Sequence, residues 1–256
     1  MRAAEGAPRP GPPGPFRRAP PARYYAGSVS QAPAPPARDA ADRPGLFLTF
    51  EGGDGVGKTT QTRILAEALR AEGVEVLVTR EPGGTDLGAE IRRLLLDGGH
   101  VDPRAEALLY AADRAHHVAT LVRPALERGA VVVSDRYLDS SVAYQGAARS
   151  LGAEDVRSLS LWATGGLLPD RTILLDADPA LADRRAGGRG GRDRLERESD
   201  AFRAALREQF LALADAEPGR IVVVDAAQPI EAVTAAVRRA LDPLLDARSG
   251  PGGQGA

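Results

Sequence analysis

Residues 51–60 read EGGDGVGKTT, and Lys58 within them is the only lysine among the 33 Lys and Arg residues of the chain. The spacing Gly52-x4-Gly57-Lys58-Thr59 is that of a phosphate-binding loop (P-loop). Its glycines let successive backbone N–H groups curl around a phosphate, and the N-terminus of a following helix attracts the same anion. A lysine suits the loop because its ammonium is a compact charge on a flexible stem, whereas a planar guanidinium needs more room. The stretch therefore predicts a site for the phosphates of a nucleotide.

On both sides of this loop, short apolar runs alternate with stretches of helical character. The runs are LFLTFE (46–51), VEVLVTR (74–80), AVVVSDR (130–136), RTILLDAD (171–178) and RIVVVDA (220–226). Apolar strands separated by helices are typical of an α/β fold, a doubly wound parallel sheet with helices on both faces. Ligands bind such sheets at the carboxyl ends of the strands. The charged residues expected along that rim are Glu51, Arg80, Asp135, Asp176 and Asp225.

The P-loop identifies a donor site but leaves the acceptor open, because motors, GTPases, helicases and small-molecule kinases share it. A GTPase reads guanine with Asn-Lys-x-Asp, and the single lysine is already used in the loop. We therefore expect ATP as donor and Mg²⁺ as cofactor, with Thr59 and Asp135 as metal-binding residues. The expected ATP-binding residues are Gly52, Gly53, Asp54, Gly55, Val56, Gly57, Lys58, Thr59 and Thr60.

Two segments that follow expected strands favour a phosphorylated acceptor. TREPGGT (79–85) supplies Arg80, and SDRYLDSSVAYQG (134–146) supplies Arg136. Two arginines in one crevice indicate a second phosphate, that of the acceptor. A phosphate oxygen is already anionic, so its attack needs cations that neutralise repulsion rather than a carboxylate base. The alternative is that each arginine is merely an exposed residue at a strand end.

An arginine- and glycine-rich segment, residues 183–198, contains six arginines and has glycines at positions 187, 188, 190 and 191. The glycines favour a mobile centre, and the sequence on both sides is compatible with helix. We predict a short lid that closes over the phosphates and excludes water. A solvated charged loop is the alternative reading.

The composition limits the class of protein. The chain of 256 residues has no cysteine, which suits the cytoplasm, and no apolar run long enough for a membrane span. Residues 1–43 hold 10 Pro and 11 Ala, so we expect a disordered tail there, and residues 246–256 read the same way. The expected domain is 44–245. Residues 1–43 carry a net charge of +4, and the whole chain carries −2, so the rest of the chain is acidic. This charge argues against nucleic acid as a partner.

Five segments together resemble thymidylate kinases. They are FEGGDGVGKTTQ (50–61), TREPGGT (79–85), LLYAADRAHHV (108–118), SDRYLDSSVAYQG (134–146) and DRLE (193–196), and the resemblance covers about residues 46–245. It implies transfer of the γ-phosphoryl group of Mg-ATP to dTMP, which gives dTDP in dTTP synthesis. It also implies a homodimer.

The same resemblance assigns roles position by position. It places Asp54 near the sugar 3′-hydroxyl and Glu81 near the metal or the sugar. The residues expected near the dTMP phosphate are Arg80, Arg92 and Arg136. Those expected at the base and sugar are Tyr110, which replaces a common stacking Phe, Arg114, which contacts the base, and Ser141, Tyr144 and Gln145.

Members of this family carry a catalytic cation either inside the P-loop or in the lid. The loop interior, residues 53–56, contains none, so the resemblance implies that the lid supplies it. Arg189 stands four residues before Asp193, at the spacing of the lid arginine in similar sequences. We therefore expect Lys58, Arg136 and Arg189 to be the catalytic residues.

Other residues favour simpler interpretations. His100, His116 and His117 have no ligand spacing with carboxylates, and Trp162 lies in a helical stretch that ends at Gly165. We expect packing roles for all four. Two alternatives to the assigned activity stay open, another nucleoside monophosphate or deoxynucleoside kinase of the same fold, and a P-loop protein that binds nucleotide without catalysis.

Overall fold

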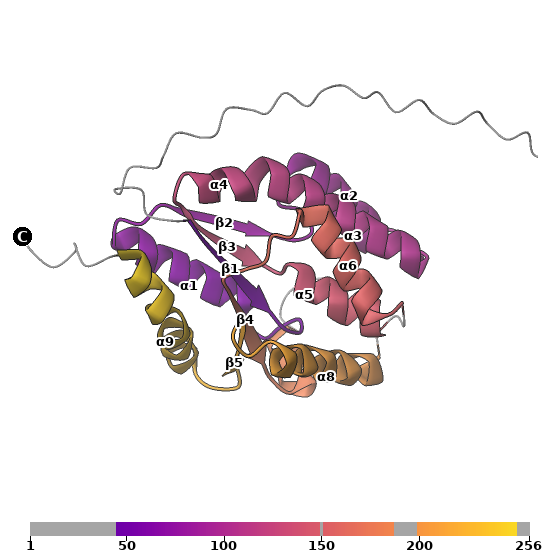
Figure 1. Cartoon of the computed structure of the whole chain (residues 1–256). Coiled ribbons are helices and arrows are strands. Elements are labelled where there is room, and N and C mark those ends of the chain that lie inside the picture. Colours follow the sequence, from indigo (N-terminus) through magenta and orange to yellow (C-terminus); the bar gives the residue numbers. More distant parts are fainter. Residues whose placement is uncertain (1–44, 149–150, 187–198, 250–256) are drawn as a thin grey trace, which may run out of the picture. The chain divides into compact units, whose positions relative to one another are not determined.

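The structure, a computed structural model, describes residues 45–148, 151–186 and 199–249 (Figure 1). All described residues belong to one compact unit. The tail expected at 1–43 and the lid residues 187–198, with Arg189, lie outside the described residues. No helix in the described part of the chain is long and apolar enough to cross a membrane.

Within the described residues, five parallel strands form one sheet in the order β2-β3-β1-β4-β5. The strands are β1 (Leu46–Glu51), β2 (Val76–Arg80), β3 (Val131–Asp135), β4 (Arg171–Asp176) and β5 (Ile221–Asp225). Each lies inside one of the five apolar runs, so the predicted fold class is confirmed. Because all strands are parallel, their charged last residues end at one edge of the sheet.

Helices cover both faces of this sheet, with α1 and α9 against one face and α4 and α8 against the other (Figure 1). The helices are α1 (Lys58–Ala71), α2 (Asp86–Leu96), α3 (Pro103–His117), α4 (Arg123–Glu127), α5 (Leu138–Ser141), α6 (Ala153–Thr164), α7 (Pro179–Ala186), α8 (Asp200–Ala216) and α9 (Ile230–Ser249). Two π-helical segments, η1 (Val118–Val122) and η2 (Val142–Ala148), follow α3 and α5. Helix α9 extends past residue 245, where we expected the domain to end.

The central strand β1 is buried on both sides, as its unbroken apolar run predicts. Leu48 and Phe50 point to the α1 and α9 side, where they join a core cluster with Leu65 of α1. Phe47 points to the opposite side and packs edge-on against the Tyr137 ring at a centroid distance of 4.9 Å. Alternate residues of a strand face opposite ways, so one run of sequence supplies both cores.

The helical region that leads into β3 begins at Pro103. The Asp102 side chain accepts a hydrogen bond from the Arg104 N–H, and proline at the first helical position needs no such acceptor. The stretch then runs through α3, η1 and α4. This long helical stretch carries Arg114 and His117 beneath the end of β2.

The expectation that Trp162 packs inside the chain is wrong, because its side chain is 81% exposed. The inward face of α6 carries Val156, Ser160 and Thr164, which recur every four residues. Trp162 falls between these positions and points outward. The helix ends as expected, with Gly165 in the left-handed conformation at φ 58°.

Candidate active site

The P-loop lies where the sequence predicts it, between β1 and α1. Gly52 and Gly57 have φ values of 125° and 100°, which glycine adopts without strain. A Cβ at Gly52 would also lie 2.3 Å from the Leu175 carbonyl oxygen, so no larger residue fits there. No side chain caps the N-terminus of α1, and its first turn has no acidic residue. The N–H groups of this turn are therefore available to an anion.

Lys58 is buried in the loop, with its side chain 7% exposed. Its ammonium donates to the carbonyl oxygens of Gly53 at 2.6 Å and Gly52 at 3.1 Å, and lies 3.8 Å from Asp54 Oδ1. Burial is the main cause that lowers the pKa of Lys58 from its ordinary value, followed by the nearby charge of Arg136. The ammonium thus lies among the groups that would surround a bound phosphate.

Two oxygen donors expected at the metal lie side by side at the carboxyl end of the sheet. Thr59 Oγ1 donates to Asp135 Oδ2 at 2.7 Å. A hydroxyl and a carboxylate next to a phosphate site fit Mg²⁺, which is usually bound by few protein groups together with substrate phosphates and water. The third expected residue, Glu81, is buried elsewhere, where its two carboxylate oxygens accept bonds from Arg114 and His117.

Arg136 joins the loop to the segment that follows β3. Its guanidinium donates to Asp54 Oδ1 at 2.5 Å, to the Gly52 carbonyl at 3.0 Å and to Ser140 Oγ at 3.0 Å. Its backbone has φ 73°, which is uncommon outside glycine and is found at functional sites. Burial would raise the pKa of Asp54, but Arg136 and Lys58 outweigh burial and lower it to about 2. Both members of the pair are therefore charged at neutral pH.

A pocket next to Arg136 gathers nearly all residues expected at the acceptor. The expected residues that line it are Asp54, Glu81, Arg92, Tyr110, Arg114, Arg136, Ser141, Tyr144 and Gln145. Arg80 does not line it, because this residue ends β2 with an exposed side chain. The lining residues that sequence reasoning missed are Pro82, Leu96, Tyr137 and Ser140. Tyr137 and Ser140 lie inside the segment SDRYLDSSVAYQG, which was the available signal for them.

The base of this segment is held by Glu51, the last residue of β1, to which the sequence assigned no role beyond its place on the rim. Its buried carboxylate accepts from the backbone N–H groups of Tyr137 at 2.8 Å and Ser140 at 3.2 Å, and contacts Ser140 Oγ at 2.6 Å. Burial, followed by the charge of Asp139, raises the pKa of Glu51 to about 7. Glu51 thus fixes Ser140, which in turn contacts Arg136.

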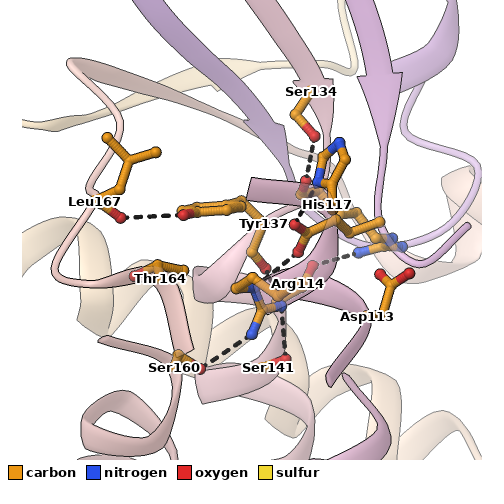
Figure 2. Close-up of polar contacts among 12 residues, drawn as sticks. Asp113, Arg114, His117, Ser134, Tyr137, Ser141, Ser160, Thr164 and Leu167 are labelled. Atoms are coloured by element: carbon orange, nitrogen blue, oxygen red, sulfur yellow. Dashed lines mark hydrogen bonds and ion pairs between the residues drawn. The ribbon is translucent and has the colours of Figure 1, made fainter. Parts of the chain in front are cut away.

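Arg114 forms the deep wall of the pocket and is held by a set of buried acceptors (Figure 2). It donates from Nε to Glu81 Oε2 (2.8 Å), from Nη1 to Ser160 Oγ (3.0 Å), and from Nη2 to the Tyr137 carbonyl (3.2 Å) and Ser141 Oγ (3.0 Å). Burial opposes its charge, but Glu81, Tyr137 and Asp113 together outweigh burial and raise the pKa of Arg114 above its ordinary value. Gln145 is fixed nearby, with Nε2 donating to Glu106 Oε1 at 2.8 Å.

Helix α7 leads toward the expected lid and is tied to the loop after β5. The Arg185 guanidinium donates to the carbonyl oxygens of Ala226 and Ala227. The loop is shaped by Asp225, whose carboxylate accepts from the Ala227 N–H at 2.8 Å. The described beginning of the lid segment is therefore anchored beside the carboxyl end of the sheet.

A parallel α/β sheet with a P-loop after its first strand, and an arginine-lined pocket beside that loop, defines a P-loop phosphotransferase of the small-molecule kinase class. The comparisons with known proteins specify the family. The family model for thymidylate kinase matches residues 50–237. The chain belongs to the thymidylate kinase family.

Known thymidylate kinases are similar to this chain in sequence and in structure. A thymidylate kinase of Leifsonia xyli is 63% identical over 203 residues, which cover 78% of this chain and 96% of that protein. One of Methylococcus capsulatus is 49% identical over 202 residues, covering 79% and 97%. The crystal structure of thymidylate kinase from Ehrlichia chaffeensis aligns with a TM-score of 0.65 at 32% identity, covering 78% of this chain and 99% of that one. The expected activity, ATP-dependent phosphorylation of dTMP to dTDP, is thereby confirmed for the family to which the chain belongs.

Proposed function

We propose that this chain transfers the γ-phosphoryl group of ATP to the phosphate of dTMP across the Asp54–Arg136 pair. The observation that carries the proposal is the position of Arg136. Its guanidinium contacts the P-loop at the Gly52 carbonyl and also lines the acceptor pocket. A donor phosphate in the loop and an acceptor phosphate in the pocket would therefore meet at this side chain.

On the donor side, residues 52–60 hold the phosphates of ATP. The N–H groups of the loop and of the first turn of α1 supply neutral donors, and Lys58 supplies a charge. We assign Mg²⁺ to Thr59 and Asp135. Glu81 is left out of this assignment because both of its oxygens already accept bonds from buried side chains. The metal would neutralise charge on the donor phosphates.

On the acceptor side, we assign the phosphate of dTMP to Arg136 and Arg92, both of which line the pocket. Arg92 is oriented by a bond from its Nη1 to the Pro82 carbonyl at 3.0 Å. Arg80, with an exposed side chain at the end of β2, would need to turn toward the pocket to contribute.

The base and the sugar occupy the rest of the pocket. Tyr110 stacks on thymine, and Arg114, Ser141 and Gln145 contact its edge. Asp54 and Tyr144 lie at the sugar, where the Tyr144 hydroxyl is 3.3 Å from Asp54 Oδ2. A deoxyribose would meet the Tyr144 ring, which is packed against Phe202 and Phe210.

The charges of the pocket agree with an anionic nucleophile. Asp54 is paired with Arg136, and Glu81 is paired with Arg114. Neither carboxylate is needed as a base, because an acceptor phosphate is already ionised, and catalysis then depends on alignment and positive charge. We assign the further cation over the transferring group to Arg189 of the lid.

We further propose a homodimer and a cytoplasmic location. Support for the dimer comes from exposed apolar side chains on three neighbouring helices. Helix α2 contacts α3, and α3 contacts α6. Leu94 is 50% exposed, Leu108 59% and Trp162 81%. Large exposed apolar side chains on neighbouring elements are typical of protein interfaces. The cytoplasmic location follows from the substrates, which are intracellular nucleotides.

A coupled assay of ADP release tests the proposed reaction. The full chain is supplied with Mg-ATP and, separately, with dTMP, AMP, CMP and GMP. We expect rapid turnover of dTMP and little turnover of the ribonucleotides. Ready turnover of AMP, CMP or GMP by a folded protein that is inactive on dTMP would contradict the proposal.

A further inference from the structure

His117 is the fully buried histidine at the end of α3, and both of its ring nitrogens have polar partners. Nδ1 lies 2.8 Å from Glu81 Oε1, and Nε2 lies 2.7 Å from Thr79 Oγ1 (Figure 2 shows the ring beside Arg114). A carboxylate accepts only, so Nδ1 carries a proton and donates it. The ring thus bridges two groups at the end of β2, which goes beyond simple packing.

The spacing along both elements explains why these groups meet. Thr79 and Glu81 are two residues apart at the end of β2 and share one side of the strand. Arg114 and His117 are three residues apart and share one face of α3. The Glu81 carboxylate lies between the two elements, with Oε1 bound by His117 and Oε2 bound by Arg114. Its orientation is therefore fixed at both oxygens.

The turn after Glu81 closes over this arrangement. A Cβ at Gly84 would lie 2.6 Å from Thr79 Oγ1 and 2.9 Å from His117 Cδ2, distances that a real side chain does not reach. The second glycine of PGG is therefore needed for close approach to the Thr79–His117 pair.

The protein contacts of Arg114 do not use all of its hydrogen-bond donors. Nε donates once, Nη1 once and Nη2 twice, so one of the five N–H groups of the guanidinium, on Nη1, has no acceptor among the described residues. Arg114 lines the acceptor pocket. The guanidinium therefore keeps one N–H beyond those that its protein contacts use.

We propose that His117 is a positioning residue for nucleobase recognition. Supported by Thr79, it fixes the Glu81 carboxylate, and Glu81 fixes the Arg114 guanidinium so that its remaining N–H serves a carbonyl oxygen of the base. The inference rests on the proposed assignment of Arg114 to the base of dTMP. Thymine presents a carbonyl oxygen at C4, whereas cytosine presents an amino group, which cannot accept this hydrogen. The arrangement of His117, Glu81 and Arg114 therefore favours dTMP over dCMP.

Three variants separate the bonds of His117. His117→Leu removes both, and His117→Asn keeps an N–H close to the position of Nδ1. Thr79→Val keeps the shape of Thr79 and removes the partner of Nε2. Because His117→Leu removes a hydrogen bond that orients a buried carboxylate, we expect it to raise KM for dTMP about 10-fold, which corresponds to about 1.4 kcal/mol. The same variant should lower the preference for dTMP over dCMP, with KM for ATP and kcat changed by less than about 2-fold.

His117→Asn should recover most of the lost affinity, to within about 3-fold of the parent. His116→Leu is the matched control, because His116 is the adjacent residue of α3 and its imidazole forms no hydrogen bond with the described residues. It should leave both KM values unchanged. If His117→Leu does not fold, Thr79→Val decides, and a rise of about 3-fold in KM for dTMP at unchanged kcat supports the proposal.

A purely structural role for His117 predicts a different pattern. The melting temperature and the active fraction would fall, while KM for dTMP and the dTMP to dCMP ratio would stay at the parental values, also in Thr79→Val. That result overturns the positioning role. A parent protein that is inactive on dTMP would instead contradict the proposed function, so the two failures are distinguishable.

Discussion

The Asp54 carboxylate and the Arg136 guanidinium lie 2.5 Å apart, and they join the P-loop to the segment that lines the acceptor pocket. Asp54 comes from the loop after β1 and Arg136 from the turn after β3, strands that are neighbours in the sheet. The guanidinium also lies 5.3 Å from the centroid of the Tyr144 ring. A single side chain therefore contacts the P-loop, lines the pocket and packs against Tyr144.

Arg136→Lys keeps the charge but cannot contact Gly52, Ser140 and Asp54 together. We expect kcat/KM for dTMP to fall about 100-fold, with KM for ATP changed by less than about 3-fold, because misplacing a charge at the reacting groups is costly. Steady-state kinetics with each substrate varied in turn measure this. Arg207→Lys, at an exposed pair with Asp176, is the control and should behave like the parent. An equal fall in kcat/KM for dTMP in both variants would count against the role of Arg136 at the reacting phosphates.

Lys58→Arg tests why the loop contains a lysine. The ammonium is enclosed by the carbonyl groups of Gly52 and Gly53, where a planar guanidinium does not fit. We expect kcat to fall at least about 100-fold while the melting temperature stays within a few degrees of the parent. Arg63→Lys, on the exposed side of the same helix, is the control. Near-parental kcat in Lys58→Arg would contradict the explanation.

Tyr144 should discriminate deoxyribose from ribose. Its ring lines the pocket and offers a 2′-hydroxyl no hydrogen bond at its apolar face, which costs about 1–3 kcal/mol for a buried hydroxyl. Tyr144→Ala should therefore narrow the gap in kcat/KM between dTMP and its ribose analogue. Tyr144→Phe should change kcat/KM for either substrate only slightly. The alternative is that Tyr144 only supports Arg136. In that case kcat/KM would fall by the same factor for both substrates in Tyr144→Ala, and the ratio of the two kcat/KM values would not change.

Glu51 should make stability depend on pH. Its pKa is raised from an ordinary value of 4.5 to about 7 in the folded chain, so between these values the folded state binds more protons than the unfolded state. The free energy of unfolding should therefore fall as pH rises through this window, by up to about 3 kcal/mol from this group. The stabilising contribution is complete below about pH 4.5 and lost above about pH 7.

Glu51→Gln removes this titration and can still accept the N–H bonds of Tyr137 and Ser140. Urea unfolding at about pH 5 and pH 7.5 should show a smaller loss of stability with rising pH in the Gln variant than in the parent. The difference between the two proteins reports Glu51 and the neighbouring groups that its charge affects. The same loss in both proteins would show that Glu51 does not titrate in this range.

The sheet and the P-loop were predictable because each is encoded locally. An apolar run specifies a buried strand, and the spacing of two glycines, Lys58 and Thr59 specifies the loop. Most pocket residues were predictable only from the resemblance to thymidylate kinases, whereas Arg136 was predictable from its place at the end of a strand. Arg80 follows the same rule but has an exposed side chain, because a place at a strand end does not determine where a long side chain points.

Contacts between distant segments were not predictable in this way. Glu51 meets Ser140 across 89 residues, and His117 meets Glu81 across 36. These pairs depend on which strands are neighbours and how far α3 extends, neither of which is given by local pattern. The outward position of Trp162 likewise depends on which face of α6 is buried, and packing against neighbouring elements buries the face with Val156, Ser160 and Thr164.

The most direct test of the account compares dTMP with thymidine as acceptors for Mg-ATP, with products identified by phosphorus NMR. The central claim is that the acceptor is a phosphate, received by Arg136 beside the P-loop. We expect stoichiometric dTDP and ADP from dTMP and no nucleotide product from thymidine, because the carboxylates that line this pocket are paired with arginines and do not serve as a base for a neutral hydroxyl. Phosphorylation of thymidine to dTMP, with dTMP itself left unreacted, would contradict it.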